Sequence, residues 1–263
     1  TGHQLMVGLM DLSAAYLKLL NGSAIQKTYP NTKQKHLICK SQILIPLAIP
    51  NICGNEAAYL QECVDTNFVS SVGPFVERLE DLVAAASGSA NAVATSSGTS
   101  GLHAALVAIG VKRDDLVIMP AMTFIATANA ISHCGASPWL FDIDEESWTL
   151  DAKQLSQALD TECIRRGDAL IHRGTGRRVA AVMPVFTLGC PPDMDAIVEA
   201  AHSHGLPVVA DTAAALGATY KGAPVAACGA DLSVFSFNGN KTVTAGGGGI
   251  VAGDDKELLN LVR

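Results

Sequence analysis

From about residue 45 to the end of the chain, short apolar runs alternate with longer amphipathic segments, and this alternation limits the possible folds strongly. Uninterrupted apolar strands that are separated by helices are typical of a parallel sheet covered on both faces. The expected strands are residues 92–95, 116–119, 138–141, 179–184, 207–210, 232–235 and 249–252. The expected helices are residues 56–64, 76–86, 99–109, 123–134, 152–159 and 194–204. The sequence therefore predicts an α/β protein with three layers, α/β/α, around a mostly parallel seven-stranded sheet.

The beginning of the chain follows a different pattern. Residues 5–20 carry apolar side chains at helical spacing, and the polar, basic stretch at residues 26–40 is typical of a linker. We expect residues 1–45 to form an N-terminal helix and linker of unknown role, and residues 46–263 to form one large domain. The arginine-rich stretch from Arg165 to Arg178 is expected to be a solvated loop.

Composition excludes several classes of function. The formal net charge of −7 argues against a nucleic-acid-binding protein, which usually carries a basic patch. The seven cysteines contain no Cys-x-x-Cys pair, which favours a reducing, cytoplasmic location. The histidines show no metal-ligand spacing, so we expect no metal site. No apolar run reaches the roughly 18 residues of a membrane span, and the start has no basic, apolar leader, so neither a membrane segment nor a signal peptide is expected.

The turn Ser97-Gly98-Thr99 ends the first expected strand of the sheet and opens a helix. Glycine allows a sharp turn, and the free N–H groups at a helix start attract an anion, to which hydroxyl groups add donors. This pattern is compatible with a phosphate site. From this turn alone, however, an ordinary helix N-cap, which serine supplies in many proteins, is the favoured interpretation.

Asp211 stands at the end of the expected strand at residues 207–210. Open α/β sheets bind ligands at the carboxyl ends of their strands, where a carboxylate can pair with a protonated pyridine nitrogen. An N-cap role for the alanine-rich segment that follows is an equally good interpretation from this residue alone.

Lys241 follows an apolar strand and precedes the glycines at 246–249, with Ser236 five residues earlier. Partial burial helps a lysine to lose its proton and attack an aldehyde, and glycine lets the backbone approach a bulky cofactor. The alternative is an ordinary surface lysine. Phe124, after the second strand, could stack on a flat ring, although core packing is the favoured interpretation from this residue alone. A phosphate turn, an aromatic residue, a carboxylate and a lysine in this order, each at or after a strand end, predict a site for pyridoxal phosphate.

Longer strings around these residues carry a resemblance to a known family. The strings are residues 97–106, 120–130, 211–222 and 235–241. In them the chain resembles the DegT/DnrJ/EryC1/StrS nucleotide-sugar aminotransferases, which have the aspartate-aminotransferase fold, fold type I of the pyridoxal-phosphate-dependent transferases. Residues 54–56, 65–73 and 238–240 resemble the members that act in legionaminic-acid-type pathways. The resemblance runs from about Ile45 to Arg263.

The resemblance implies a role for each candidate residue. It assigns cofactor binding to Gly98, Thr99, Phe124, Asp211, Ser236 and Lys241. Lys241 would bond the cofactor's aldehyde and then move the proton, and Asp211 would hold the ring nitrogen. Phe124 would stack on the ring, while the other three residues would bind the phosphate. The resemblance also implies glutamate as amino donor, a nucleotide-linked 4-keto-6-deoxy sugar as acceptor, a role in polysaccharide biosynthesis, and a homodimer with active sites between the subunits.

Three departures from the family pattern support other interpretations. Ala214 stands where the family usually has glutamine or glutamate, and Phe186 stands where it has histidine. The family also continues beyond the position of Arg263 with a smaller domain, which we expect to be absent here. A truncated or degenerate, non-catalytic relative that binds cofactor or a partner is therefore an alternative. A sugar dehydratase is a weaker one, because that subgroup carries histidine at the position of Lys241.

Overall fold

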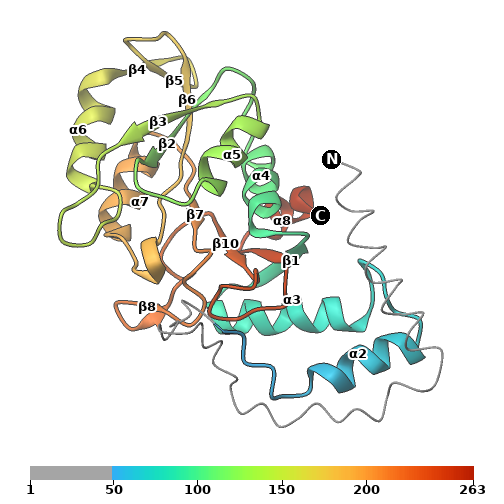
Figure 1. Cartoon of the computed structure of the whole chain (residues 1–263). Coiled ribbons are helices and arrows are strands. Elements are labelled where there is room, and N and C mark those ends of the chain that lie inside the picture. Colours follow the sequence, from blue (N-terminus) through green and yellow to red (C-terminus); the bar gives the residue numbers. More distant parts are fainter. Residues whose placement is uncertain (1–48) are drawn as a thin grey trace, which may run out of the picture. The chain divides into compact units, whose positions relative to one another are not determined.

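The computed structural model describes residues 49–263, so the helix and linker expected within residues 1–45 lie outside the described residues (Figure 1). Residues Pro50–Arg263 form one compact unit. No helix within these residues has the length and apolar character needed to cross a membrane.

The described part of the chain confirms the expected strands and helices, with ends that differ by a few residues. The helices are α2 (Glu56–Asp65), α3 (Pro74–Ser87), α4 (Gly98–Ala108), α5 (Ala126–His133), α6 (Ala152–Glu162), α7 (Met194–Ser203) and α8 (Lys256–Val262), with a short 3-10 helix η1 (Thr187–Gly189). The strands are β1 (Asn91–Thr95), β2 (Leu116–Pro120), β3 (Ser137–Phe141), β4 (Cys163–Arg166), β5 (Ala169–His172), β6 (Arg178–Val182), β7 (Val209–Asp211), β8 (Thr219–Tyr220), β9 (Ala223–Pro224), β10 (Leu232–Ser236) and β11 (Gly249–Gly253).

The strands form a mixed arrangement, and the expectation of a single mostly parallel seven-stranded sheet was too simple. One ladder has the order β3-β2-β6-β5-β4 and another has the order β1-β11-β10-β7. Two isolated parallel bridges, Val182 to Val208 and Val185 to Asp211, link the two ladders. β11 runs antiparallel to both of its neighbours. The reason is local: a parallel return needs a long crossover, usually a helix, and residues 237–248 contain none.

The arginine-rich stretch that was expected to be a solvated loop instead forms most of a β-hairpin. β4 and β5 pair antiparallel, with Ile164 opposite Ile171. The turn between them contains Gly167 at φ 58°, a left-handed conformation that glycine adopts without a steric penalty. Leu170 is buried against the core. The prediction was wrong because the charged residues hid an apolar alternation that is typical of a strand.

Helices cover both faces of the sheet, as expected for a three-layer fold. One buried apolar cluster contains residues of α3, α6 and α7, and the other contains residues of α4, α5 and α8. Within β2, Ile118 belongs to the first cluster, whereas Val117 and Met119 belong to the second. Figure 1 shows α6 and α7 on one side of β2 and β6, and α4 and α5 on the other. The alternation of side chains along each strand therefore builds the two cores.

At the amino ends of β2, β3 and β6, hydrogen bonds from two arginines tie the strands together. Arg178 Nε donates to Asp115 Oδ1 at 3.0 Å, and this side-chain hydrogen bond raises the pKa of Arg178. Arg177 Nη2 donates to Ser137 Oγ at 2.9 Å and to the Asp115 carbonyl oxygen at 3.0 Å. We call Asp115, Arg177 and Arg178 the arginine clamp. It fixes the end of the sheet that lies away from the candidate site.

Candidate active site

A cavity of about 650 Å³ lies at the carboxyl ends of the strands, and it brings together all the candidate residues. Its lining includes Gly98, Thr99, Phe124, Asp211, Ser236 and Lys241. These residues come from α4, from the loop after β2, from the ends of β7 and β10 and from the loop between β10 and β11. The cavity is therefore assembled from segments that are far apart in the sequence.

The start of α4 supplies an open anion site. Ser97 Oγ accepts the Ser100 N–H at 3.1 Å and Ser100 Oγ accepts the Ser97 N–H at 2.9 Å, so the N-cap role considered from the sequence is confirmed. The N–H groups of Gly98 and Thr99 belong to the first positions of the helix, where no intrahelical acceptor exists. A Cβ on Gly98 would lie 2.9 Å from the Ser236 Cβ. Glycine thus lets the helix start approach Ser236 closely, and together they fit a phosphate group.

Asp211 is the last residue of β7, and only 5% of its surface is exposed. Its Oδ2 accepts the Thr127 hydroxyl at 2.7 Å and its Oδ1 accepts the Ala213 N–H at 3.2 Å. Burial raises the pKa of Asp211, against the lowering effects of these two hydrogen bonds and of the positive charge of Lys241. Turns rather than a helix follow at residues 212–218, so the N-cap interpretation is wrong.

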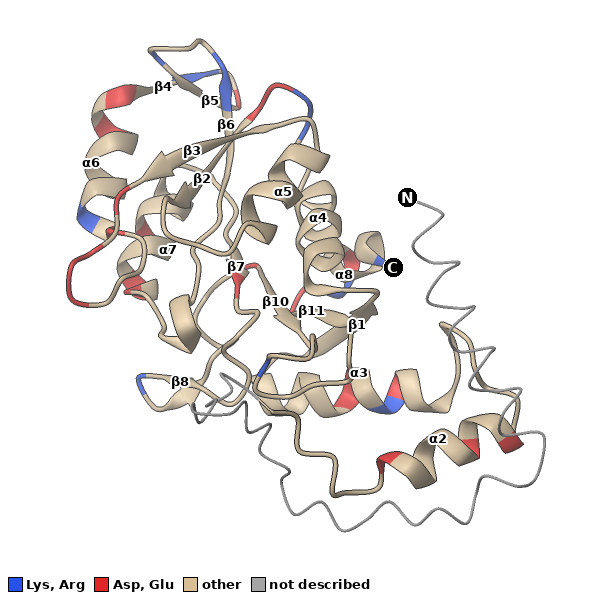
Figure 2. Cartoon of the chain, in the orientation of Figure 1, with Lys and Arg blue, Asp and Glu red and all other residues tan. Residues whose placement is uncertain are grey.

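Lys241 lies half-buried in the loop between β10 and β11, where its N–H donates to the Asn238 carbonyl oxygen at 2.9 Å. Lys241 and Asp211 line the same cavity, and the positive charge of Lys241 lowers the pKa of Asp211. Among the described residues that line the cavity, Asp211 and Lys241 carry the formal charges. Figure 2 marks further charged residues along α2, α3 and α6 and on the β4–β5 hairpin. Partial burial in the cavity wall argues against an ordinary surface lysine.

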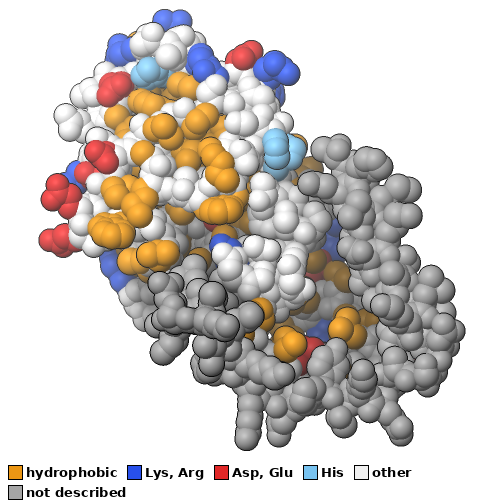
Figure 3. Space-filling model, viewed as in Figure 1, with side chains coloured by type: hydrophobic (Ala, Val, Ile, Leu, Met, Phe, Trp, Pro, Cys, Tyr) orange, Lys and Arg blue, Asp and Glu red, His pale blue; other side chains and the backbone are white. Residues whose placement is uncertain are grey.

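Apolar side chains surround the mouth of the cavity. Phe124 is 75% exposed, so the core-packing interpretation is wrong and its ring is free to contact a ligand. Leu188, also in the lining, is 88% exposed and has φ 54°, a left-handed conformation that is uncommon for leucine. On the face seen in Figure 3, apolar side chains gather over β2 and β3. An exposed apolar rim of this kind marks a surface that a ligand or partner covers.

The two positions that depart from the family pattern both line the cavity. Phe186 is 2% exposed and packs into the core cluster that contains α6 and α7. Ala214 presents only a methyl group. Next to Phe186, the buried hydroxyl of Thr187 has no hydrogen-bond partner among the described residues. The wall of the cavity near these residues is therefore less polar than the family pattern implies.

Sequence reasoning assigned no role to Thr123 and Thr127, although the structure links them to Asp211. The two hydroxyl oxygens lie 2.7 Å apart, and Thr127 contacts the carboxylate. Their spacing of four residues was a usable signal, because residues four apart lie on the same side of a helical turn. The burial of Thr127 was not visible from the sequence.

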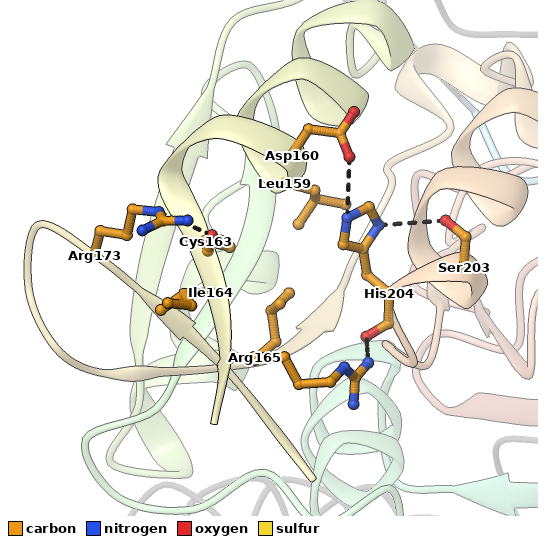
Figure 4. Close-up of a pocket in the computed structure, with 9 residues that line it drawn as sticks. Leu159, Asp160, Cys163, Ile164, Arg165, Arg173, Ser203 and His204 are labelled. Carbon is orange, nitrogen blue, oxygen red and sulfur yellow. Dashed lines mark hydrogen bonds and ion pairs between the residues drawn. The ribbon is translucent and has the colours of Figure 1, made fainter. Parts of the chain in front are cut away.

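A second, smaller hollow of about 280 Å³ lies between α6, the β4–β5 hairpin and the end of α7 (Figure 4). The His204 ring lies 3.3 Å from Asp160, and Arg165 donates to the His204 carbonyl oxygen at 2.6 Å. Arg173 donates to the Cys163 carbonyl oxygen at 3.0 Å, and burial raises the pKa of the Cys163 thiol to about 11. These groups contact one another, and the raised pKa disfavours the reactive thiolate, so the contacts in this hollow join structural elements.

Comparison with known proteins identifies the family of the chain. Residues 50–263 match the DegT/DnrJ/EryC1/StrS aminotransferase family. The chain belongs to this family. The family has fold type I, which the solved structures of its members share with this chain. The comparisons do not test the similarity to the legionaminic-acid subgroup, which stays a prediction.

Three relatives illustrate the similarity. The GDP-perosamine synthase of Caulobacter vibrioides is 42% identical over 219 residues, which cover 83% of this chain and 54% of that protein. The structure of DesI with its TDP-sugar product matches with 34% identity and a TM-score of 0.69, over 79% of this chain and 48% of DesI. NtdA from Bacillus subtilis, with bound cofactor PMP, matches with 28% identity and a TM-score of 0.67, over 78% and 42%. The chain thus spans about half the length of these relatives.

Proposed function

We propose that this chain is the cofactor-binding part of a pyridoxal-phosphate-dependent aminotransferase that transfers the amino group of glutamate to a nucleotide-linked 4-keto-6-deoxy sugar. The observation that carries the proposal is the shared cavity: Lys241 and Asp211 line it together with the helix start at Gly98. The names of two relatives, which mention GDP-perosamine and a TDP-sugar product, support a nucleotide sugar as the acceptor. We further propose residues 46–263 as the large domain of this enzyme.

The lining residues fit pyridoxal phosphate in charge and shape. Gly98, Thr99 and Ser236 would hold the phosphate, and Phe124 would contact the flat face of the ring. Asp211 would pair with the ring nitrogen. When bound, the cofactor supplies an electron sink that stabilises the carbanion formed at an amino acid's α-carbon.

Lys241 would act in two ways. Its Nζ would bond the cofactor's aldehyde carbon in place of the oxygen, which leaves as water, and after release the same nitrogen would carry a proton. Overall, the amino group of glutamate replaces the keto oxygen of the sugar and glutamate leaves as its 2-oxo acid, so no external oxidant is needed. The apolar lining around Met122, Phe124 and Phe186 would exclude water from this exchange.

Two further properties belong to the proposal. The exposed apolar residues at the cavity mouth, Phe124, Ile125 and Leu188, support a homodimer in which a second copy covers this rim. Free cysteines, of which Cys163 and Cys228 are buried, support a cytoplasmic enzyme. The family resemblance supports a role in polysaccharide biosynthesis. A monomer by light scattering at micromolar concentration would contradict the dimer.

The decisive experiment is a transfer assay with the whole purified chain, pyridoxal phosphate and labelled glutamate. GDP-linked and TDP-linked 4-keto-6-deoxy sugars serve as acceptors, and mass spectrometry identifies the product. Label in an amino sugar supports the proposal. A product that has lost water without gaining nitrogen would indicate a dehydratase, and cofactor binding without any product would indicate the non-catalytic alternative.

A further inference from the structure

Thr127, near the start of α5, makes the shortest contact to the carboxylate of Asp211. Its side chain is fully buried, and its Oγ1 lies 2.7 Å from Asp211 Oδ2. Building on the proposed function, we infer that Thr127 is a positioning residue for Asp211. Its hydroxyl fixes the orientation of the carboxylate and stabilises the ionised form that pairs with a protonated ring nitrogen.

The direction of the hydrogen bonds follows from the chemistry of the carboxylate. An ionised carboxylate only accepts hydrogen bonds, so Thr127 donates its single hydroxyl proton to Asp211. The Thr123 and Thr127 oxygens lie 2.7 Å apart. Since the proton of Thr127 is already committed, Thr123 donates to Thr127. Two hydroxyl groups thus form a chain that ends on the carboxylate, and Thr123 at the other end lines the cavity.

Asp211 is held at both of its oxygens. The Ala213 N–H binds Oδ1 at 3.2 Å and the Thr127 hydroxyl binds Oδ2. Rotation of the carboxylate would break both hydrogen bonds, which keeps it in one orientation. The Ala213 contact comes from the backbone and is available to any residue there, whereas the Thr127 contact depends on the side chain. Lys241 is the charged group that acts on Asp211 within the described residues.

Ordinary packing of a buried threonine is the competing explanation, and Thr212 offers a matched control for it. Thr212 is also fully buried and is the next residue after Asp211 in the chain. Its hydroxyl donates to the Val234 carbonyl oxygen at 2.9 Å instead of to the carboxylate. Replacing either threonine with valine removes the same atoms from a buried position. Only the change at Thr127 removes a hydrogen bond from Asp211.

The test measures binding of 4′-deoxypyridoxine phosphate by calorimetry. This compound keeps the ring nitrogen and the phosphate but lacks the aldehyde, so it reports on Asp211 without a bond to Lys241. Thr127→Val is expected to weaken its binding about 10-fold to 100-fold, as expected for loss of a hydrogen bond to a charged group. Thr212→Val and Thr127→Ser, which leave the hydrogen bond to Asp211 in place, are expected to bind it nearly as the wild type does.

Equal weakening by Thr127→Val and Thr212→Val would overturn the inference, because it would show a general effect of packing. Binding by Thr127→Val that equals wild type would overturn it as well. Circular dichroism checks that each variant folds, and Thr127→Ala, compared with Thr212→Ala, replaces the pair if the valine variant does not fold. If the wild-type chain itself binds neither this compound nor pyridoxal phosphate, the proposed function fails instead. The two failures are therefore distinguishable.

Discussion

At the amino ends of β2 and β6, Asp115 and Arg178 bind each other directly, whereas at the carboxyl ends of β7 and β10 the charges of Asp211 and Lys241 face a cavity. In the arginine clamp, Asp115 pairs with Arg178 and Arg177 donates to uncharged oxygen atoms, and these contacts tie neighbouring strands together. At the other end, burial disfavours the ionised form of Asp211, and Leu188 adopts an uncommon backbone conformation. One end of the sheet therefore stabilises the fold. The other end keeps polar groups available for a ligand, and this arrangement lowers the stability of the fold.

The largest effect is expected from Lys241→Ala. Loss of the amine removes covalent cofactor binding and lowers amino transfer by at least about 1000-fold, since no other lysine lines the cavity among the described residues. The absorbance spectrum of added pyridoxal phosphate measures covalent binding. Lys221→Ala, which removes a surface lysine paired with Asp195, is the control and should behave as wild type. Identical spectra for wild type and Lys241→Ala would show that the lysine assignment is wrong.

At the clamp, Asp115→Ala should lower the free energy of unfolding by about 1–2 kcal/mol, because Arg178 loses its partner but is exposed enough for water to solvate its guanidinium. Urea denaturation measures this change. Cofactor affinity should stay unchanged, because the clamp lies at the opposite ends of the strands. Asp114→Asn is the control, since asparagine tolerates the φ of 68° at that position. A large loss of cofactor affinity in folded Asp115→Ala would contradict the claim that the clamp only stabilises the fold.

Gly98→Ala should weaken cofactor binding about tenfold and cost about 1–3 kcal/mol in stability, because its new Cβ would meet Ser236 at 2.9 Å. Fluorescence titration with pyridoxal phosphate and thermal unfolding measure the two effects. Gly239→Ala is the matched control, because a Cβ there would meet nothing within 4 Å. If both variants bind the cofactor equally well, the phosphate does not lie at the start of α4.

The smallest effect is a gain in stability. Burial raises the folded-state pKa of Asp211 above its unfolded value, so the carboxyl group stabilises the fold at low pH and this contribution is lost as pH rises through the folded pKa. Without cofactor at pH 7, Asp211→Asn should therefore be more stable than wild type by about 0.5–2 kcal/mol. The advantage should shrink as pH falls towards 3.8. Denaturation curves at several pH values would reveal the opposite trend if Asp211 is stabilising when ionised.

The sequence predicted the positions of the strands and helices well, because unbroken apolar runs and helical spacing are local signals. It also identified six of the residues that line the cavity, partly because the ends of parallel strands lie at one edge of a sheet and partly through the family resemblance. The roles of these residues remain proposals. The antiparallel course of β11 was missed, because strand direction depends on the connection rather than on the strand itself.

Two kinds of information lay beyond local sequence. The hydrogen bond between Thr127 and Asp211 joins residues 84 positions apart, and nothing near Thr127 indicates its partner. The exposure of Phe124 was not visible from that residue alone, since a phenylalanine usually packs in a core, and only the family resemblance indicated a ring that contacts a ligand. Both depend on how distant segments meet, which a single sequence specifies only through the whole fold.

The position of β11 between β1 and β10 has a consequence for biosynthesis. Asn91 pairs with Gly253, so within the described residues β1 has no ladder partner until β11 has left the ribosome. The turn at Gly98 and the loop with Lys241 consequently meet only late, and such long-range pairing slows folding and leaves β1 with an open edge meanwhile. Nascent chains that stop before Ile250 would be unable to complete the pocket and would be candidates for chaperone binding.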